Sequence, residues 1–160
     1  MAIHHLNTSQ FLAISLDEAW EFFSSPDNLA EITPQYLDFQ IEFKTGDTAY
    51  PGQMIRYKIK PVWGISLQWL TEITVVKDKE FFIDEQRQGP YRLWHHEHRF
   101  REVEGGIRME DILTYSLPFG IIGELMHRLW IKRQIEGIFQ YRKECLESLF
   151  DRPRASLAAI

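Results

Sequence analysis

The sequence predicts one α+β domain in which a curved antiparallel sheet of about seven strands wraps around a long C-terminal helix, with two short helices after the first strand. Apolar and polar residues alternate in about seven short segments, as in half-buried strands. Helical spacing then runs from residue 121 to residue 150. With 160 residues, 44% of them hydrophobic, the chain can bury one sizeable core. Because a sheet of so many hairpin-linked strands curls, we expect the helix to cover its apolar face and to leave a cavity between them.

The first elements are a strand over residues 3–14 and two short helices. Ser15 and Glu18 form a capping box, in which the serine oxygen accepts from one unpaired amide and the glutamate accepts from another. The second helix begins at Pro26, because proline is tolerated at the first helical position. The apolar side chains that share one face of the first helix are Leu16, Ala19, Trp20 and Phe23.

Six further strands are expected before the long helix. They cover residues 39–43, 55–59, 65–76, 81–86, 92–102 and 107–117. Gly89 and Pro90 interrupt the chain before the fifth of them, and Gly105–Gly106 forms a hairpin turn before the last. Strands joined by such short turns pair antiparallel.

The long helix carries two apolar stripes in place of one. Four residues, Ile121, Ile122, Leu125 and Leu129, centre on one direction. A second set, Ile135, Ile138, Phe139, Cys145, Leu146 and Leu149, centres on a direction rotated by roughly 110° at 100° per residue. This rotation predicts a bend or a change of packing partner near residues 131–134. The domain therefore covers residues 1–150, and residues 151–160 are expected to form a flexible tail.

Composition excludes several classes of protein. The formal net charge of −5 argues against a nucleic-acid-binding surface, which needs clustered lysine and arginine. No window of about 18 uncharged apolar residues exists, so we expect no membrane span. Cys145 is the single cysteine and the first residues do not resemble a signal peptide, so a cytoplasmic location is expected. No glycine-rich phosphate loop or nucleophile elbow is present, and no cofactor is expected.

Five parts of the chain share a pattern with known proteins: residues 15–23, 26–29 with 32–34, 89–91 with 94–100, 115–120 and 138–142. These segments resemble one superfamily, the START, Bet v 1 and polyketide-cyclase-like (SRPBCC) ligand-binding proteins, and in particular its uncharacterised bacterial members. The resemblance covers roughly residues 5–150 and implies the helix-grip fold. It implies no single function, because the superfamily includes lipid carriers, hormone receptors, cyclases and co-chaperone domains.

The hairpin at Gly105 fixes a register that can be tested. If Val103 faces Gly106, then His98 lies opposite Asp111 and Trp94 lies opposite Tyr115. This register puts the apolar residues of both strands on one face, whereas a slip of one residue would set them against charged residues. The side chains that then share the apolar face, and so the cavity side of the sheet, are Trp94, His96, His98, Phe100, Met109, Asp111, Leu113 and Tyr115.

The facing His98 and Asp111 have three possible roles. Directly opposed side chains have Cβ atoms about 5 Å apart, close enough for an imidazole–carboxylate hydrogen bond. Such a bond favours the imidazolium form and fixes the tautomer, which suits general acid–base catalysis. It also suits the binding of a polar group at the bottom of an apolar pocket. A buried pair can equally satisfy only itself and lock the strand register.

Two further features of this face bear on the site. His96 and His98 lie about 6.5 Å apart along the strand, and Asp111 could complete a zinc or iron site with them. A hydrogen bond across the strands is the simpler interpretation, so no metal is predicted. If residues 78–79 form a two-residue turn, Phe82 faces Val75 and Asp84 faces Ile73, which points Asp84 inward or places it at the pocket rim.

These observations favour non-covalent binding of a small hydrophobic molecule, lipid-, polyketide- or aromatic-like, in the internal cavity. The expected wall residues are Trp69, Phe82, Trp94, Phe100, Met109, Leu113, Tyr115 and Leu125. The expected polar groups are Asp84, His96, His98, Asp111 and Tyr115. One alternative is a cyclase- or dehydratase-like enzyme that uses His98 and Asp111 as its acid–base pair. Another is a regulatory interaction module without a ligand, and a monomer or a homodimer fits each alternative.

Overall fold

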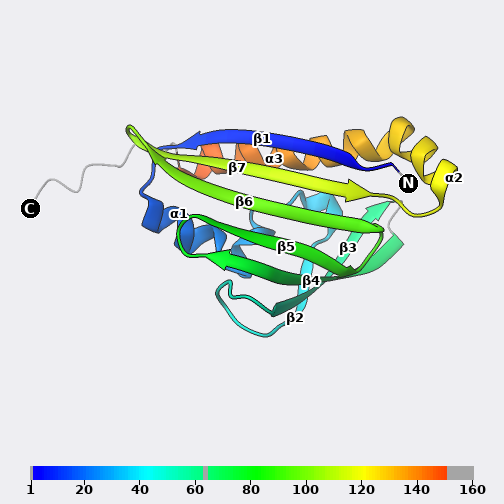
Figure 1. The fold of residues 1–160 in the computed structure, drawn as a ribbon, viewed down its shortest axis with the longest axis horizontal. Helices are drawn as coiled ribbons and strands as arrows, with labels where there is room; N and C mark the ends of the chain where they lie inside the picture. The colour runs from blue at the N-terminus through cyan, green and yellow to red at the C-terminus, as the bar shows by residue number, and fades with distance from the viewer. Residues whose placement is uncertain (1, 63–64, 151–160) are drawn as a thin grey trace, which may run out of the picture.

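The computed structural model describes residues 2–62 and 65–150, and the expected tail, 151–160, lies outside these ranges. Seven strands and two main helical regions follow one another as drawn in Figure 1. The strands are β1 (His4–Leu12), β2 (Gln40–Lys44), β3 (Gln53–Val62), β4 (Ile65–Lys77), β5 (Phe81–Gln88), β6 (Leu93–Val103) and β7 (Gly106–Ser116). The helical elements are α1 (Leu16–Phe23), η1 (Pro26–Ala30), η2 (Gln35–Leu37), α2 (Gly120–Met126), η3 (His127–Ile131) and α3 (Lys132–Phe150).

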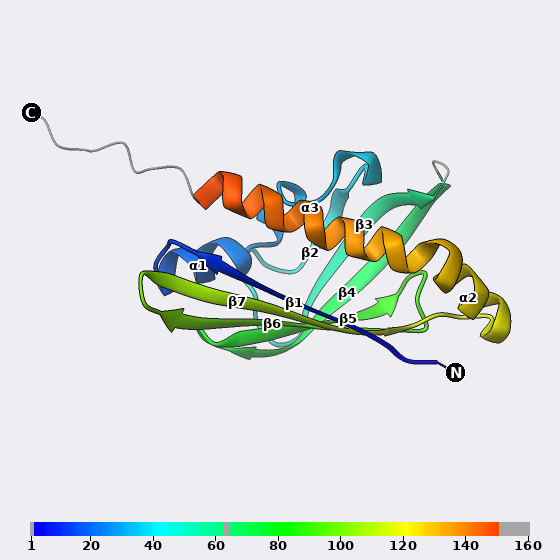
Figure 2. The ribbon, with the colours of Figure 1, turned by 90° about the horizontal axis from the view of Figure 1, so that it is seen from above.

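All seven strands belong to one antiparallel sheet in the order β1-β7-β6-β5-β4-β3-β2. The first strand therefore pairs with the last, and β1 and β2 form the edges. Figure 2 shows α3 running along one face of the curved sheet, with α1 near one end of the sheet and α2 near the other. The predicted fold class, a curved sheet around a long C-terminal helix, is confirmed.

The register of β6 and β7 is the one that the hairpin turn predicts. Val103 pairs with Gly106, His98 with Asp111 and Trp94 with Tyr115. Between β4 and β5 the structure departs from the prediction at one point. Asp84 faces Ile73 as expected, but Phe82 faces Val76 and not Val75. The reason is the turn, which has three residues (78–80) and not two, because Lys77 pairs with Phe81. A bulge between Ile73 and Val75 leaves one residue of β4 unpaired and so brings Asp84 back opposite Ile73.

The elements after β1 fold as their capping residues require. The Ser15 side chain accepts from the Glu18 amide at 3.2 Å, and Glu18 Oε2 accepts from the Ser15 amide at 2.9 Å. This capping box starts α1, which buries Trp20 with its ring edge-on to Phe82 and Phe100. The second short helix, η1, is a 3₁₀ turn with Pro26 at its first position.

The C-terminal helix changes its packing partner at η3, a π-helical turn just upstream of the predicted position. Beyond this turn the second apolar stripe faces the sheet, because Ile135, Phe139 and Leu146 are buried. Before it the first stripe faces solvent, with Ile121 90% exposed. The two stripes that the sequence shows thus have opposite surroundings.

Candidate ligand cavity

A cavity of about 280 Å³ lies within the fold, lined by residues from the sheet, from α3 and from the segment that follows α1. Its volume is slightly below the 300–1,000 Å³ that is roughly typical of small-ligand sites. Most of its lining is apolar. Six residues predicted for the site do line it, namely Trp69, Phe82, Asp84, Trp94, His96 and His98.

Four predicted wall residues, one on β6 and three on β7, are not among the described residues that line the cavity: Phe100, Met109, Leu113 and Tyr115. All four are buried in the core. Leu113 packs in one cluster with Ile135 and Phe139 of α3, whereas Met109 packs in a second cluster that includes Leu12. The cavity therefore lies under β3, β4, β5 and β6.

Leu125 is also wrongly predicted as a wall residue. Its side chain is 56% exposed, because α2 turns its apolar stripe away from the sheet. His127 lies on the opposite side of this helix, where it is buried, with its Nε2 2.8 Å from the Tyr115 hydroxyl. The helical spacing is as predicted, but the polar side of the helix faces the sheet.

Four polar side chains from three adjacent strands form the His–Asp cluster, three of them lining the cavity and Asp111 behind them: Asp84 on β5, His96 and His98 on β6, and Asp111 on β7. His96 Nε2 lies 3.0 Å from Asp111 Oδ1, and His98 Nε2 lies 2.8 Å from Asp84 Oδ2. The second ring nitrogens complete the set, with His96 Nδ1 3.4 Å from Asp84 and His98 Nδ1 3.1 Å from Asp111. Each imidazole therefore lies between two carboxylates.

The predicted hydrogen bond between His98 and Asp111 is only partly correct. The two residues are opposite each other and 3.1 Å apart, but the Nδ1 of His98 makes no hydrogen bond. The well-aligned bonds cross over, from His98 to Asp84 and from His96 to Asp111. Asp111 lies behind the histidines and lines a smaller second cavity, whereas Asp84, His96 and His98 face the main one.

The cluster favours a charged His96, because a carboxylate faces each nitrogen of its ring. A neutral imidazole would turn a lone pair toward a carboxylate oxygen, whereas an imidazolium donates in both directions. Burial opposes the charge on His96, but the hydrogen bonds to Asp111 and Asp84 outweigh it and raise the pKa of His96 to about 8. Burial likewise opposes the charge on Asp84 and Asp111, and the two histidines nevertheless hold the pKa of each carboxyl below its ordinary range.

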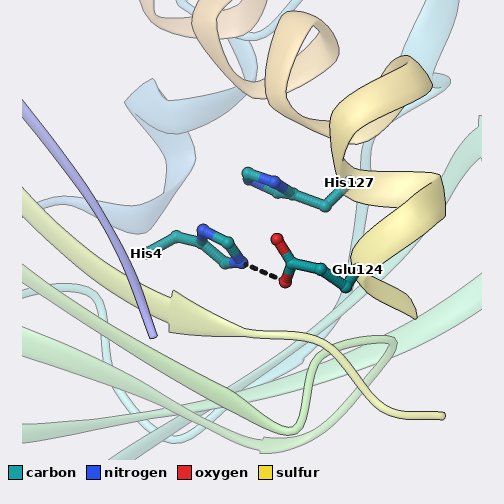
Figure 3. A group of neighbouring side chains, drawn as sticks. All are labelled: His4, Glu124 and His127. Carbon is teal, nitrogen blue, oxygen red and sulfur yellow. Dashed lines mark hydrogen bonds and ion pairs between the residues drawn. The ribbon is translucent and has the colours of Figure 1, made fainter. Parts of the chain in front are cut away.

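A divalent metal ion would use a set of ligands that differs from His96, His98 and Asp111, the set that the sequence suggested. Asp84, His96 and His98 offer three ligand atoms within 4.8 Å of one another, so Asp84 takes the place of Asp111. His4, Glu124 and His127 make a second such group at the N-terminal end of β1 (Figure 3). There the His4 and His127 rings stack 3.6 Å apart and nearly parallel, so one ion cannot lie in the plane of both.

Comparison with known proteins identifies the fold. No family model matches the chain, and no curated protein matches it. Among solved structures, it is similar to CV1439 from Chromobacterium violaceum (11% identity, TM-score 0.69), with 94% of this chain and 99% of that one covered. It is also similar to Ara h 8.0201, a Bet v 1 family protein, with 15% identity and a TM-score of 0.59, over 92% of this chain and 99% of that one. A third similar structure is ginseng major latex-like protein 151 from Panax ginseng, with 9% identity and a TM-score of 0.64, over 92% of this chain and 97% of that one. The chain has the Bet v 1-type helix-grip fold. No helix in residues 2–62 and 65–150 is long and apolar enough to cross a membrane.

Two polar groups in the helix-grip cavity escaped the sequence prediction. The Oε1 of Gln53 and the Nε of Arg142 are buried without a hydrogen-bond partner, and both residues line the cavity. The Arg142 guanidinium lies 5.2 Å from the centre of the Phe139 ring. Both have a signal in the sequence, since Arg142 falls within the apolar stripe of α3 and Gln53 shares the inward face of β3 with Ile55.

Proposed function

We propose that the protein binds one small hydrophobic molecule with an acidic head group, non-covalently, in the helix-grip cavity. The observation that carries this proposal is an apolar cavity lined by Arg142, whose buried Nε has no hydrogen-bond partner within residues 2–62 and 65–150. A buried donor without a partner costs free energy, and a carboxylate, phenolate or sulfonate of a ligand would satisfy it. Gln53 Oε1 offers an acceptor for a hydroxyl of the same ligand.

Aromatic rings at one end of the cavity favour a flat, apolar body for this ligand. The Trp69 ring lies 4.9 Å from the Trp94 ring and 5.4 Å from the Tyr91 ring. All three residues line the cavity. Aromatic side chains supply large apolar surfaces that bind rings well in offset or edge-on arrangements.

The His–Asp cluster supports binding more than acid–base catalysis. A catalytic imidazole needs a nitrogen that can reach the substrate, but all four ring nitrogens of His96 and His98 lie within 3.4 Å of a carboxylate. We infer that the cluster provides a fixed, polar floor against which a head group is oriented. The cavity itself favours a ligand-binding role over a module with a filled interior.

Binding can be tested with the fluorescent dye 8-anilinonaphthalene-1-sulfonate, which carries an aromatic body and an anionic head. We expect saturable binding of about one dye per chain. Leu67→Trp should abolish it, because Leu67 lines the cavity. Leu149→Trp is the matched control, since Leu149 is 39% exposed and is not among the lining residues. Equal binding by the two variants would place the dye elsewhere and contradict the proposal.

The acidic head group can be tested separately. We expect Arg142→Met to weaken the binding of an aromatic carboxylic acid by about 10- to 100-fold, as for a lost hydrogen bond to a charged group. The corresponding primary amide should bind both proteins alike. Competition against the dye measures both. If Arg142→Met weakens the acid and the amide equally, Arg142 does not recognise charge.

A further inference from the structure

The end of the molecule formed by Pro118 and the α2–η3 helix has an apolar surface, which we call the apolar tip. Among described residues, the four most exposed large apolar side chains all lie here: Phe119 at 80%, Ile121 at 90%, Ile122 at 68% and Leu129 at 71%. Leu125 and Met126 extend this surface. An apolar surface that is contiguous at one end of a protein marks an interaction site rather than scattered exposure.

The apolar tip is the outer face of a helix whose polar side faces inward. Glu124 contacts His4 of β1 at 3.1 Å (Figure 3). His127 contacts Tyr115 of β7 at 2.8 Å. A surface helix of a soluble domain normally has the reverse orientation, with apolar residues toward the sheet. These polar contacts therefore fix the helix with its apolar stripe toward solvent.

Gly123 holds the helix in this orientation from a second side. A Cβ atom at this position would lie 2.1 Å from the carbonyl oxygen of Pro118, so no larger residue fits without a backbone shift. The close approach packs the α2 backbone on the loop that precedes it. The outward direction of Ile121 and Leu125 is thus built into the backbone.

Basic residues continue the exposed face of the apolar tip. Arg128 follows Leu125 by three residues, and Lys132 and Arg133 follow Leu129 by three and four, spacings that share one helical face. The Arg128 side chain is 77% exposed and lies 3.6 Å from Glu124, and the Lys132 side chain is 62% exposed and lies 3.8 Å from Glu136. With Arg133, three basic side chains face these two carboxylates, so this segment has a small positive charge in a chain whose net charge is −5.

The geometry points to peripheral docking of the apolar tip on an anionic lipid surface. Apolar side chains with adjacent arginine and lysine fit the boundary between acyl chains and anionic head groups. A second copy of the chain fits less well, because a two-fold interface through the tip would bring these basic residues toward one another. This docking does not depend on the ligand proposed above.

Docking at this end would also bring the cavity to the lipid. Trp130 and Ile131 of η3 line the cavity, and they adjoin Leu129 of the apolar tip in the chain. Leu117, another lining residue, lies just before Phe119. A hydrophobic molecule that leaves or enters the bilayer would therefore have this end of the cavity next to it.

Sedimentation with lipid vesicles tests the docking. We expect the full chain to bind vesicles of phosphatidylcholine with about one third phosphatidylglycerol at least about tenfold more tightly than pure phosphatidylcholine, and less so in high salt. The double variant Ile121→Ser/Leu125→Ser should bind the anionic vesicles with an affinity that is lower by about tenfold or more. Arg128→Gln/Lys132→Gln/Arg133→Gln should lose the preference for anionic lipid. Both changes concern exposed side chains, so the melting temperature should stay unchanged.

Phe11→Ser is the matched control, because Phe11 is also exposed, at 51%, and lies against Gly105 at the opposite end of the sheet (Figure 1). It should bind anionic vesicles like the unchanged protein. Absence of binding by the unchanged protein, or equal binding by Ile121→Ser/Leu125→Ser, would overturn the proposal. A dimer in sedimentation velocity that this variant converts to a monomer, without vesicle binding, would identify the tip as a self-association surface instead.

Discussion

Two groups of histidine and carboxylate in this protein have similar members and opposite electrostatics. In the His–Asp cluster, two carboxylates flank two imidazoles, and the pKa of His96 rises to about 8 although burial opposes it. At the N-terminal end of β1, Glu124 is the single carboxylate beside the stacked His4 and His127. There burial and the neighbouring His4 lower the pKa of His127. The carboxylates on both sides of the His96 ring, and not burial alone, therefore decide which form of this histidine the fold favours.

The largest expected difference between the two groups is in stability. Asp111→Ala leaves two buried imidazoles with one carboxylate, and we expect it to lower the free energy of unfolding by about 3–5 kcal/mol. The Asp111 side chain is 9% exposed, so water cannot replace the lost partner. Urea denaturation measures the loss. A loss below about 1 kcal/mol would show that the cluster is not an electrostatic unit.

The pH dependence of stability should separate the two groups by sign. The folded state binds the His96 proton more tightly than the unfolded state, so this contribution is complete below pH 6.5 and is lost as the pH rises through about 8. The expected loss is about 2 kcal/mol for a shift of this size. His127 acts oppositely, because its lowered pKa adds stability as the pH rises toward the ordinary value of 6.5. Unfolding curves of the unchanged protein, His96→Gln and His127→Gln across this range test both signs.

Asp111→Asn makes the inner cluster resemble the outer group, with two imidazoles and one carboxylate. We expect the pKa of His96 to fall by at least about one unit, equivalent to about 1.4 kcal/mol. Titration of the imidazole C–H signals by NMR measures it. Dye binding in the same folded variant then separates roles, since unchanged affinity would show that the charge of Asp111 does not contribute to the ligand site.

The smallest effect is expected at the outer group. Glu124 is 30% exposed, and its contact with His4 is partly screened by water. Glu124→Gln should therefore change the free energy of unfolding by less than about 1 kcal/mol. If Glu124→Gln lowers the free energy of unfolding as much as Asp111→Ala does, then burial does not explain why the two groups differ in their contribution to stability.

The parts that the sequence predicted correctly are those controlled by local geometry. The alternation of side chains across a pleated strand allows only one register once the turn at Gly105 is placed, and every pair of β6 and β7 follows it. The capping box between Ser15 and Glu18 depends on residues only three apart. Asp84 faces Ile73 as predicted only because the bulge in β4 offsets the extra residue of the 78–80 turn.

The parts that were missed depend on how distant elements pack. Periodicity shows that Leu125 belongs to a stripe but does not show which side of the helix faces the sheet. The exchange of hydrogen bonds between His98 and Asp84 requires the position of β5 beside β6. Arg142 was visible as a charged residue within an apolar stripe, but only the structure shows that its Nε is buried without a partner.

The pairing of β1 with β7 has a consequence for how the chain folds. His4 pairs with Tyr115, so the first strand finds its partner only after more than one hundred further residues are available. Non-local pairing of this kind slows folding, because the entropy of closing the long loop must be lost before the contacts form. Until β1 docks, β7 presents an unpaired edge that a second chain can occupy. The first strand therefore also protects the nascent sheet against aggregation.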